Sequence, residues 1–222
     1  MGARHVAIIM DGNARWAEER GHSVLEGHRE GAQALKRTVR NAVRLGIAEL
    51  TVYAFSTENW TRPRAEVEGL MAMFADLIRS ETPELDEQGV RMSFIGRREE
   101  VSPDLRERMR WAEEVTAGND RMALFVAFNY GGRAEILDAA ERYAGGGEEE
   151  FSRLLYAPEM TDPDLLIRTS GERRLSNYLL WQSAYSELHF SDTLWPDFDE
   201  ADLAAALDDY EARERRFGAR VR

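Results

Sequence analysis

Short apolar runs alternate along this chain with longer amphipathic stretches. The runs are mostly apolar and four to seven residues long, which is typical of strands buried in a parallel sheet. They cover His5–Met10, Leu50–Phe55, Val90–Ile95, Ala123–Asn129 and Leu165–Arg168. The stretches between them place apolar residues at helical spacing. They cover Gly31–Leu45, Glu66–Leu85, Pro103–Thr116 and Ala134–Tyr143. Strands that alternate with helices predict an α/β fold in which helices cover a central, mostly parallel sheet.

The remaining segments add detail to this plan without adding a second domain. Gly145–Glu150, three glycines followed by three glutamates, predicts a flexible, charged surface connection. Glu200–Phe217 predicts a C-terminal helix that ends in a basic cluster of Arg213, Arg215 and Arg216. We find no internal repeat and expect residues 1–222 to form one domain.

Composition narrows the class of protein. A chain of 222 residues is long enough for a full core, and without cysteine it has no disulfide framework and no thiolate metal site. It shows no N-terminal signal pattern and no apolar run near the roughly 18 residues of a membrane span, so we expect a soluble cytoplasmic protein. The 29 Lys and Arg against 41 Asp and Glu give a net charge of −12, which argues against nucleic-acid binding. A local arginine cluster still suits an anionic ligand, because charges act over a Debye length of about 8–10 Å.

The strongest chemical signal follows the first apolar run, in the segment Asp11–Arg15. A helix that begins here would turn backbone N–H groups toward an anion, and Arg15 adds a forked donor suited to phosphate. Asp11 would lie at the carboxyl end of a strand, where open α/β sheets place ligands. An acid beside a phosphate suggests a bridging divalent metal. An Asp-Gly turn before an ordinary helix fits the same residues, so the motif alone leaves both interpretations open.

Two later polar segments also follow predicted strands. Phe55–Trp60 with Arg62 is either a ligand-facing loop or a capped helix entry. Arg168, Arg174 and Ser176 either converge on one diphosphate through charge-assisted bonds or form a solvated basic turn. The wide apolar face of Glu66–Leu85 is most often core.

Six blocks of sequence in order resemble the cis-prenyltransferases, the undecaprenyl diphosphate synthase family. They are His5–Ala17, Gly27–Gly31, Tyr53–Trp60 with Arg62–Pro63, Asn129–Arg133, Ile167–Asn177 and Leu180–Phe198. The resemblance implies one catalytic domain with a hydrophobic tunnel, and a Mg²⁺-dependent homodimer. Its activity would be the transfer of an allylic prenyl diphosphate, farnesyl or geranyl, onto isopentenyl diphosphate with formation of cis double bonds. The polyprenyl diphosphate product would serve cell-wall lipid carrier synthesis and bring the enzyme into peripheral contact with a membrane.

The same resemblance implies roles for single residues. Catalytic roles fall on Asp11 and Asn59, where Asn59 or Asn13 would orient a diphosphate oxygen that accepts the proton. The allylic diphosphate site would comprise Gly12, Asn13, Ala14, Arg15, Trp16, Arg20 and His28. A mobile loop over the substrate would include Ser56, Thr57, Glu58, Trp60 and Arg62. Isopentenyl diphosphate would bind Arg168, Arg174 and Ser176. Magnesium would bind Asp11 and Glu187, the latter from the same chain or from across a dimer, and Arg216-Phe217-Gly218 would reach the partner's site.

Departures from the family pattern bear on affinity and product length. Val24 replaces a usual arginine and removes a phosphate contact. Small Ala54 and the flexible Met71 and Met73 favour a medium or long product, whereas one of Phe125 and Phe128 would act as a tunnel floor. The alternative is a short-chain cis-prenyl diphosphate synthase.

Two other classes of protein are less consistent with the sequence. A non-catalytic family subunit would lose its acid and loop arginines, yet Asp11, Arg168 and Arg174 are present. A doubly wound nucleotide-binding enzyme would need G-x-x-x-x-G-K-[ST] or G-x-G-x-x-G, and neither occurs.

Overall fold

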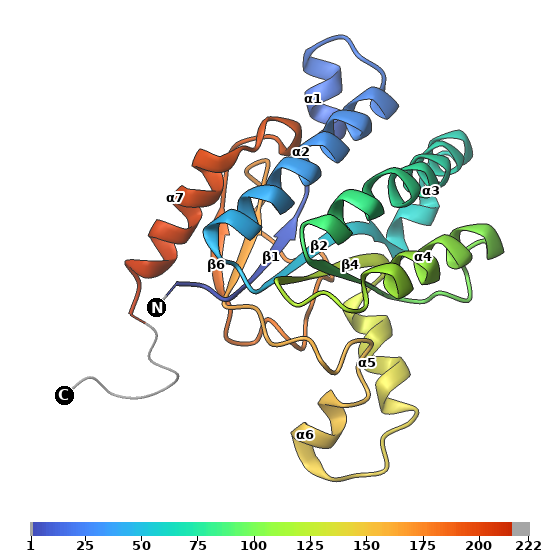
Figure 1. The fold of residues 1–222 in the computed structure, drawn as a ribbon, viewed down its shortest axis with the longest axis vertical. Coiled ribbons are helices and arrows are strands. Elements are labelled where there is room, and N and C mark those ends of the chain that lie inside the picture. Colours follow the sequence, from blue (N-terminus) through green and yellow to red (C-terminus); the bar gives the residue numbers. More distant parts are fainter. Residues whose placement is uncertain (1, 215–222) are drawn as a thin grey trace.

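All strands in residues 2–214, the part of the chain that the structure describes, belong to one sheet. The computed structural model orders six parallel strands as β3-β4-β2-β1-β5-β6 (Figure 1). Their bounds are His5–Ile9 (β1), Glu49–Ser56 (β2), Val90–Ile95 (β3), Met122–Tyr130 (β4), Leu165–Arg168 (β5) and Glu187–Phe190 (β6). The predicted α/β fold with a parallel sheet is therefore confirmed, and β6 extends it at one edge.

The described residues also form seven α-helices and two short 3₁₀ turns. The helices are Asn13–Glu19 (α1), Val24–Leu45 (α2), Arg64–Glu87 (α3), Pro103–Thr116 (α4), Gly132–Ala140 (α5), Gly147–Ser152 (α6) and Glu200–Glu211 (α7). The 3₁₀ turns are Thr57–Thr61 (η1) and Trp195–Asp197 (η2). No helix of this part of the chain combines the length and apolarity needed to cross a membrane.

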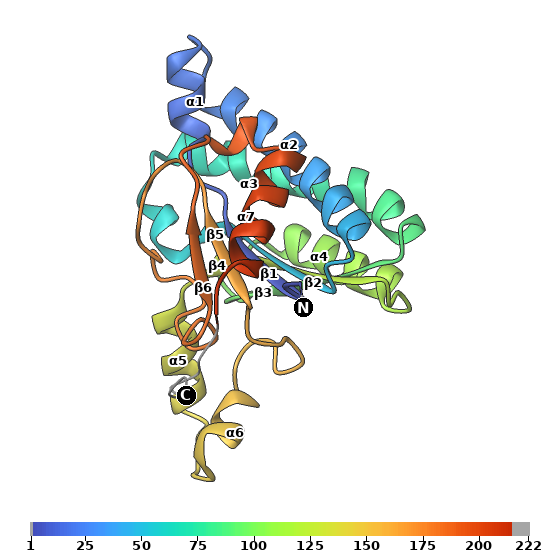
Figure 2. The ribbon, with the colours of Figure 1, turned by 90° about the vertical axis from the view of Figure 1, so that its left-hand side faces the viewer.

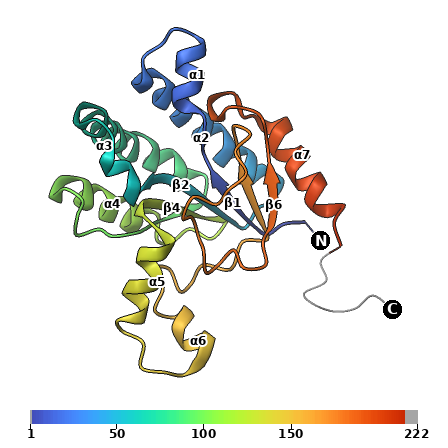
Figure 3. The same cartoon turned by 180° about the vertical axis from the view of Figure 1, so that it is seen from behind.

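The helices cover the two faces of the sheet unequally. On one face, β-strand residues such as Ile8 and Val52 pack in a core with side chains of α2, α3, α4 and α7. On the other face, Ile9 and Phe125 pack with Tyr178 and Leu179 from the loop after β5. Figure 2 shows α1 and α6 at opposite ends of the molecule, and Figure 3 shows α7 beside β6 at one edge of the sheet.

Several helix boundaries differ from the predicted ones, among them the end of α5 at Ala140 rather than Tyr143. α2 begins at Val24, seven residues before the predicted start, because Ser23 and Glu26 form a capping box. The predicted flexible connection Gly145–Glu150 instead contains the start of α6, whose first turn carries three glutamates that favour a helix N-terminus. The predicted helix Glu200–Phe217 is too long: α7 ends at Glu211, and Arg213 of the predicted basic cluster follows it. The remaining members, Arg215 and Arg216, and the segment Arg216-Phe217-Gly218 lie outside the described residues.

Candidate active site

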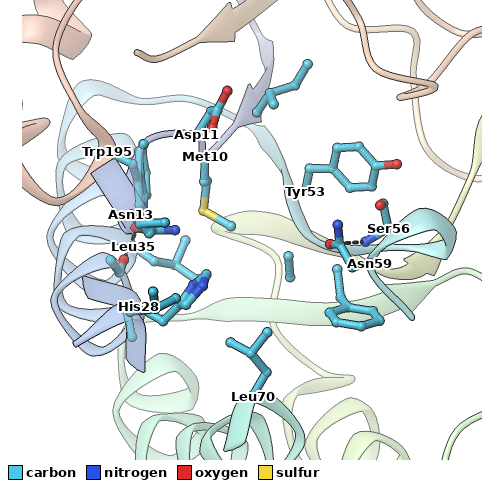
Figure 4. A pocket seen from close by; sticks show the side chains of 18 of the residues that line it. Met10, Asp11, Asn13, His28, Leu35, Tyr53, Ser56, Asn59, Leu70 and Trp195 are labelled. Carbon is cyan, nitrogen blue, oxygen red and sulfur yellow. Dashed lines mark hydrogen bonds between the residues drawn. The ribbon is translucent and has the colours of Figure 1, made fainter. Parts of the chain in front are cut away.

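A cavity of about 570 Å³ opens at the carboxyl edge of the sheet, between α2 and α3 (Figure 4). Its mouth is polar and carries most of the predicted site residues. These are Asp11, Gly12, Asn13, Ala14, Arg15, His28, Ser56, Asn59, Arg62, Arg168, Arg174 and Ser176. Its deeper wall is apolar and is formed by Leu35, Leu70, Met73, Phe74 and Leu77. The parallel sheet thus brings three polar segments, far apart in sequence, to one opening.

A second apolar cavity of about 90 Å³ adjoins the first. The two share five lining residues, Ala32, Leu35, Ala54, Phe74 and Leu77. Phe128 lines the second cavity and stacks on Phe55, whereas Phe125 packs in the core on the other face of the sheet. Of the two phenylalanines, Phe128 is therefore the one that lines this cavity.

An ionic cluster lies beside this second cavity and joins α2 to α3. The ammonium of Lys36 lies 2.7 Å from Glu81 Oε2 and 2.8 Å from Glu84 Oε2. Arg40, one turn further along α2, also pairs with Glu84. The apolar region therefore ends at a charged contact between two helices.

The backbone of Asp11 is fixed by Thr169 and Trp195. Its N–H donates to Thr169 Oγ1 (2.9 Å), and its carbonyl accepts the Thr169 hydroxyl (2.6 Å) and the Trp195 N–H (3.0 Å). The carboxylate Oδ2 accepts from Arg168 Nη2 at 2.9 Å and lies 3.6 Å from Arg15 Nη2. Asp11 is thus held at the cavity mouth between two guanidinium groups.

Arg168 connects the acid to the predicted isopentenyl diphosphate residues. Its side chain is only 5 % exposed, and its Nη1 donates to the Arg174 carbonyl (2.5 Å) and to Ser176 Oγ (2.6 Å). Its Nε is buried without a protein partner. Arg174 is 61 % exposed and pairs with Glu172, so its guanidinium can turn toward a ligand. A buried, fixed cation and an exposed, adjustable one stand side by side.

The predicted substrate loop, residues 56–62, closes one side of the mouth. Asn59 Oδ1 accepts the Ser56 N–H (3.0 Å), which orients the amide beside the cavity. Trp60 packs edge-on against Phe55, and its indole N–H donates to Asn129 Oδ1 (2.7 Å). The structure therefore shows this loop anchored on β4 through Asn129.

His28 lies inside the mouth as an uncharged ring. Burial lowers its pKa to about 4, Arg62 adds to the effect, and Glu66 opposes it. Its Nε2 is 3.8 Å from Glu66 Oε1 and has no hydrogen-bond partner. At neutral pH the residue offers a ligand a neutral donor or acceptor rather than a positive charge.

Several predicted site residues do not line the cavity. Trp16 and Arg20 turn outward and bind the two carboxylate oxygens of Asp197 at 2.7 and 2.8 Å. The side chain of Arg20 also stacks over the Trp16 ring, 4.5 Å from its centroid. Thr57, Glu58 and Trp60 lie on the loop but outside the cavity lining.

Glu187 lies at the amino end of β6, whereas Asp11 follows the carboxyl end of β1. It opens β6 and is aligned through Leu165 with Val6, five residues before Asp11. Strand spacing and rise put the two carboxylates of one chain roughly 15–20 Å apart. Glu187 instead pairs with Arg213 (2.8 Å). One chain therefore does not bring the predicted magnesium ligands together.

The residues at the mouth could bind magnesium only together with oxygen atoms of a bound substrate, because they offer too few carboxylates to enclose the ion. Within residues 2–214, no group of three or more His, Cys, Asp or Glu side chains could enclose an ion. Magnesium is commonly held by one or two carboxylates together with phosphate oxygens and water. Both arginine contacts of Asp11 use Oδ2, so Oδ1 could bind a cation without breaking them.

Four polar residues that sequence reasoning missed support the site. Thr169 fixes Asp11, Ser170 accepts both Nη groups of Arg15, and Asn129 anchors the loop. The fourth, Asn177, binds Glu58. Asn129, Thr169 and Ser170 come at or directly after the ends of β4 and β5, so the position rule that pointed to Asp11 applies to them as well.

Comparison with known proteins gives a consistent result. A family described as "Putative undecaprenyl diphosphate synthase" matches residues 9–218. An isoprenyl transferase of Thermotoga maritima is 50 % identical, with 98 % of this chain and 97 % of that protein covered. A Xanthomonas axonopodis protein named ditrans,polycis-undecaprenyl-diphosphate synthase, (2E,6E)-farnesyl-diphosphate specific, is 47 % identical over 97 % of this chain and 92 % of its own length. The crystal structure of lavandulyl diphosphate synthase from Lavandula x intermedia with dimethylallyl diphosphate covers 98 % of each chain, at 38 % identity and a TM-score of 0.94.

Proposed function

The chain belongs to the undecaprenyl diphosphate synthase family of prenyltransferases, and from that premise we propose that it condenses a farnesyl or geranyl diphosphate with isopentenyl diphosphate. The observation that carries the proposal is the arginine-rich mouth over an apolar cavity. A prenyl diphosphate has a strongly anionic diphosphate end and a hydrocarbon tail, and this cavity matches both ends. The farnesyl-specific name of the Xanthomonas relative supports farnesyl diphosphate as the primer.

The allylic diphosphate would lie over Gly12–Arg15, with its tail along Leu35 and Leu70. Gly12 has φ 113°, and a Cβ there would approach Leu194 and Ser170 to 3.0–3.1 Å. Glycine therefore lets the chain turn sharply from β1 into α1. Arg15, held by Ser170, would bind a phosphate oxygen through its forked donor.

Isopentenyl diphosphate would bind Arg168, Arg174 and Ser176 on the other side of Asp11. The Nε of Arg168 is buried and has no hydrogen-bond partner, so it could donate to an oxygen of the diphosphate. Arg174 would leave Glu172 for the phosphate. With the two diphosphates on either side of Asp11, the double bond of one substrate faces the allylic carbon of the other.

In the reaction, the isopentenyl double bond attacks the allylic carbon while the allylic carbon–oxygen bond breaks. Diphosphate leaves with the bonding electrons, and loss of a proton then gives the new cis double bond. Arg15 and Arg168 oppose the charge that develops on the leaving group. Asn59 would orient the diphosphate oxygen that takes the proton. Asp11 would hold magnesium, and the ion would supply further positive charge when bound.

Glu187 enters this scheme through a homodimer. Glu187 and Asp11 of one chain lie at opposite ends of the parallel strands. Glu187 would therefore bind the metal in the site of a second copy of the chain. The Glu187–Arg213 pair at the start of β6 would then open or shift on assembly.

We propose a medium or long polyprenyl product, made for a cell-wall lipid carrier. The second cavity beyond Ala54 offers space for further isoprene units. The alternative, a short product, gains support from the likeness to lavandulyl diphosphate synthase.

The test is incubation with radiolabelled isopentenyl diphosphate, magnesium and each allylic primer, followed by chromatography of the dephosphorylated products. Wild type should elongate, and Asp11→Ala should lose turnover while keeping its thermal unfolding transition. More than a tenth of wild-type activity in Asp11→Ala at saturating magnesium would remove Asp11 from metal binding. A product of one or two condensations would select the short-chain alternative.

A further inference from the structure

Asn177 joins the two loops that border the candidate active site. We propose that it is a positioning residue that couples the isopentenyl diphosphate loop, residues 172–179, to the substrate loop, residues 56–62, through Glu58. Ordering of either loop by its own substrate would then favour binding of the other substrate. The inference rests on the proposed function, since it takes the two loops as the two substrate sites.

The backbone around Asn177 is held in a conformation that most residues avoid. Ser176, Asn177 and Leu179 have φ values of 48°, 63° and 43°, all in the left-handed region. Tyr178 and Leu179 are fully buried in the core under the sheet. Burial of the two residues that follow Asn177, together with the left-handed backbone, fixes the direction in which its amide points.

The amide of Asn177 uses its two ends on different elements. Its Oδ1 accepts the N–H of Arg133 (2.8 Å) and its backbone carbonyl accepts the N–H of Gly132 (2.7 Å), at the start of α5. Its Nδ2 donates to Glu58 Oε1 (2.8 Å) in the substrate loop. One end of the side chain is therefore bound to rigid structure, and the other reaches a loop at the mouth.

The two loops meet closely because a glycine stands between them. A Cβ on Gly131 would lie 2.6 Å from Thr57 Oγ1 and 2.8 Å from Asn177 Nδ2. Either distance is too short for a carbon, so a side chain at this position would separate the loops. The contact between Glu58 and Asn177 is thus built into the backbone and does not depend on two long surface chains that happen to meet.

Glu58 and Asn177 both lie next to residues that line the cavity. Asn59 follows Glu58 at the allylic side, and Ser176 precedes Asn177 and binds Arg168. Neither Glu58 nor Asn177 lines the cavity itself. Their hydrogen bond therefore links the two substrate loops outside the cavity. It affects the position of the loops and contacts neither ligand.

The carboxylate form of Glu58 is the form that this bridge needs. Burial raises its pKa, but the hydrogen bonds that it accepts, led by that from Asn177, outweigh burial and leave the pKa below its usual range. Glu58 is therefore an acceptor at neutral pH, and Asn177 is the donor.

A coupling of this kind is reciprocal and is measured as a ratio of affinities. The dissociation constant of isopentenyl diphosphate is measured by calorimetry alone and with saturating farnesyl thiodiphosphate, an allylic analogue with a poor leaving group. For wild type we expect the analogue to tighten isopentenyl diphosphate binding by about fivefold or more, the lower range of ordinary allosteric coupling.

Isosteric variants exchange the donor and the acceptor. Asn177→Asp keeps the acceptor toward Arg133 and tolerates the left-handed backbone, but it places a carboxylate oxygen against Glu58. We expect its coupling ratio to fall below about twofold. Glu58→Gln keeps the acceptor and should keep the wild-type ratio. The double variant Asn177→Asp with Glu58→Gln reverses the bond, with the glutamine amide as donor, and should restore the ratio.

Glu58→Ala gives a second route to the same result without touching the cap of α5. It should lose the coupling as Asn177→Asp does, and thermal unfolding of every variant checks that the fold is kept. A wild-type ratio near one, an Asn177→Asp ratio equal to wild type, or a double variant that stays uncoupled would each overturn the inference. If wild type neither binds nor elongates prenyl diphosphates, the proposed function itself fails, which is a separate outcome of the same experiments.

Discussion

The contact between α1 and α2 yields a prediction that opposes simple helix propensity. Gly27 and Gly31 lie on the face of α2 that meets Asn13, and both are buried. A Cβ on Gly27 would lie 2.2 Å from the Asn13 carbonyl oxygen, and one on Gly31 would lie 2.2 Å from Asn13 Oδ1. The first obstacle is backbone, and the second is the end of a side chain that can rotate.

These geometries predict different changes in stability for the two alanine variants. Glycine to alanine inside a helix gains about 1 kcal/mol from propensity. Overpacking costs about 1–3 kcal/mol, and Gly27→Ala meets backbone, so it should pay the upper part of that range. A net loss of about 1–2 kcal/mol lowers Tm by about 2–8 °C in a chain of this size. Gly31→Ala should leave Tm near wild type, because rotation of Asn13 relieves the overlap.

The assay is thermal unfolding followed by circular dichroism, with steady-state kinetics on the same samples. Gly31→Ala turns Asn13 away from the allylic diphosphate site, so its KM for the allylic primer should rise severalfold. Gly69→Ala in α3 is the matched control, since a Cβ there meets only Leu25 at 3.4–3.6 Å. It should raise Tm by about 2–4 °C.

Two results would refute this reasoning. A Gly27→Ala protein that melts at or above wild type would show that α1 is not held against α2 by close approach. A Gly31→Ala protein with wild-type KM for the allylic primer would remove Asn13 from that site.

Three further predictions concern the cavity. Arg174→Ala should raise KM for isopentenyl diphosphate more than for the allylic primer, because an exposed charge-assisted bond is lost; equal effects in initial-rate kinetics would contradict separate diphosphate sites. His28 titrates near pH 4 when folded and near 6.5 when unfolded, so its contribution to stability is present above about pH 6.5 and disappears as the pH falls toward 4. Because of this residue, the free energy of unfolding in urea should be about 2 kcal/mol lower at pH 5 than at pH 7.5. In His28→Gln, this part of the pH dependence should be absent. Phe128→Ala should lengthen the product and Ala54→Leu should shorten it, whereas unchanged chromatograms would take both residues away from the growing chain.

Sequence reasoning located the site because parallel strands end at a common edge. Asp11 and Arg168 end or follow adjacent strands, so a parallel sheet brings them together whatever their separation in sequence. The same rule explains why Ser56 and Asn59 of the neighbouring strand and turn lie nearby.

Side-chain direction and strand order were not accessible in the same way. Trp16 and Arg20 lie on or just beyond a two-turn helix, and spacing alone does not say that Asp197 will draw both away from the cavity. Glu187 lies far from Asp11 because it is the first residue of β6 and pairs with Leu165 at the start of β5. The short alternating sequence of β6 does not reveal this register. α2 begins before the predicted Gly31 because the Ser23–Glu26 capping box stabilises an earlier N-terminus, despite the low helical propensity of Gly27.

The ionic cluster of Lys36, Glu81 and Glu84 makes the far wall of the apolar region different from the sheet behind it. The sheet side is sealed by strands and aromatic rings, whose separation would expose core to water. Ion pairs between partly exposed side chains hold α2 against α3 at this point. Salt weakens their attraction, because the Debye length falls from about 10 Å at 0.1 M to about 3 Å at 1 M. A hydrocarbon tail that outgrows the space would therefore emerge between these two helices, and ionic strength would set how readily they part.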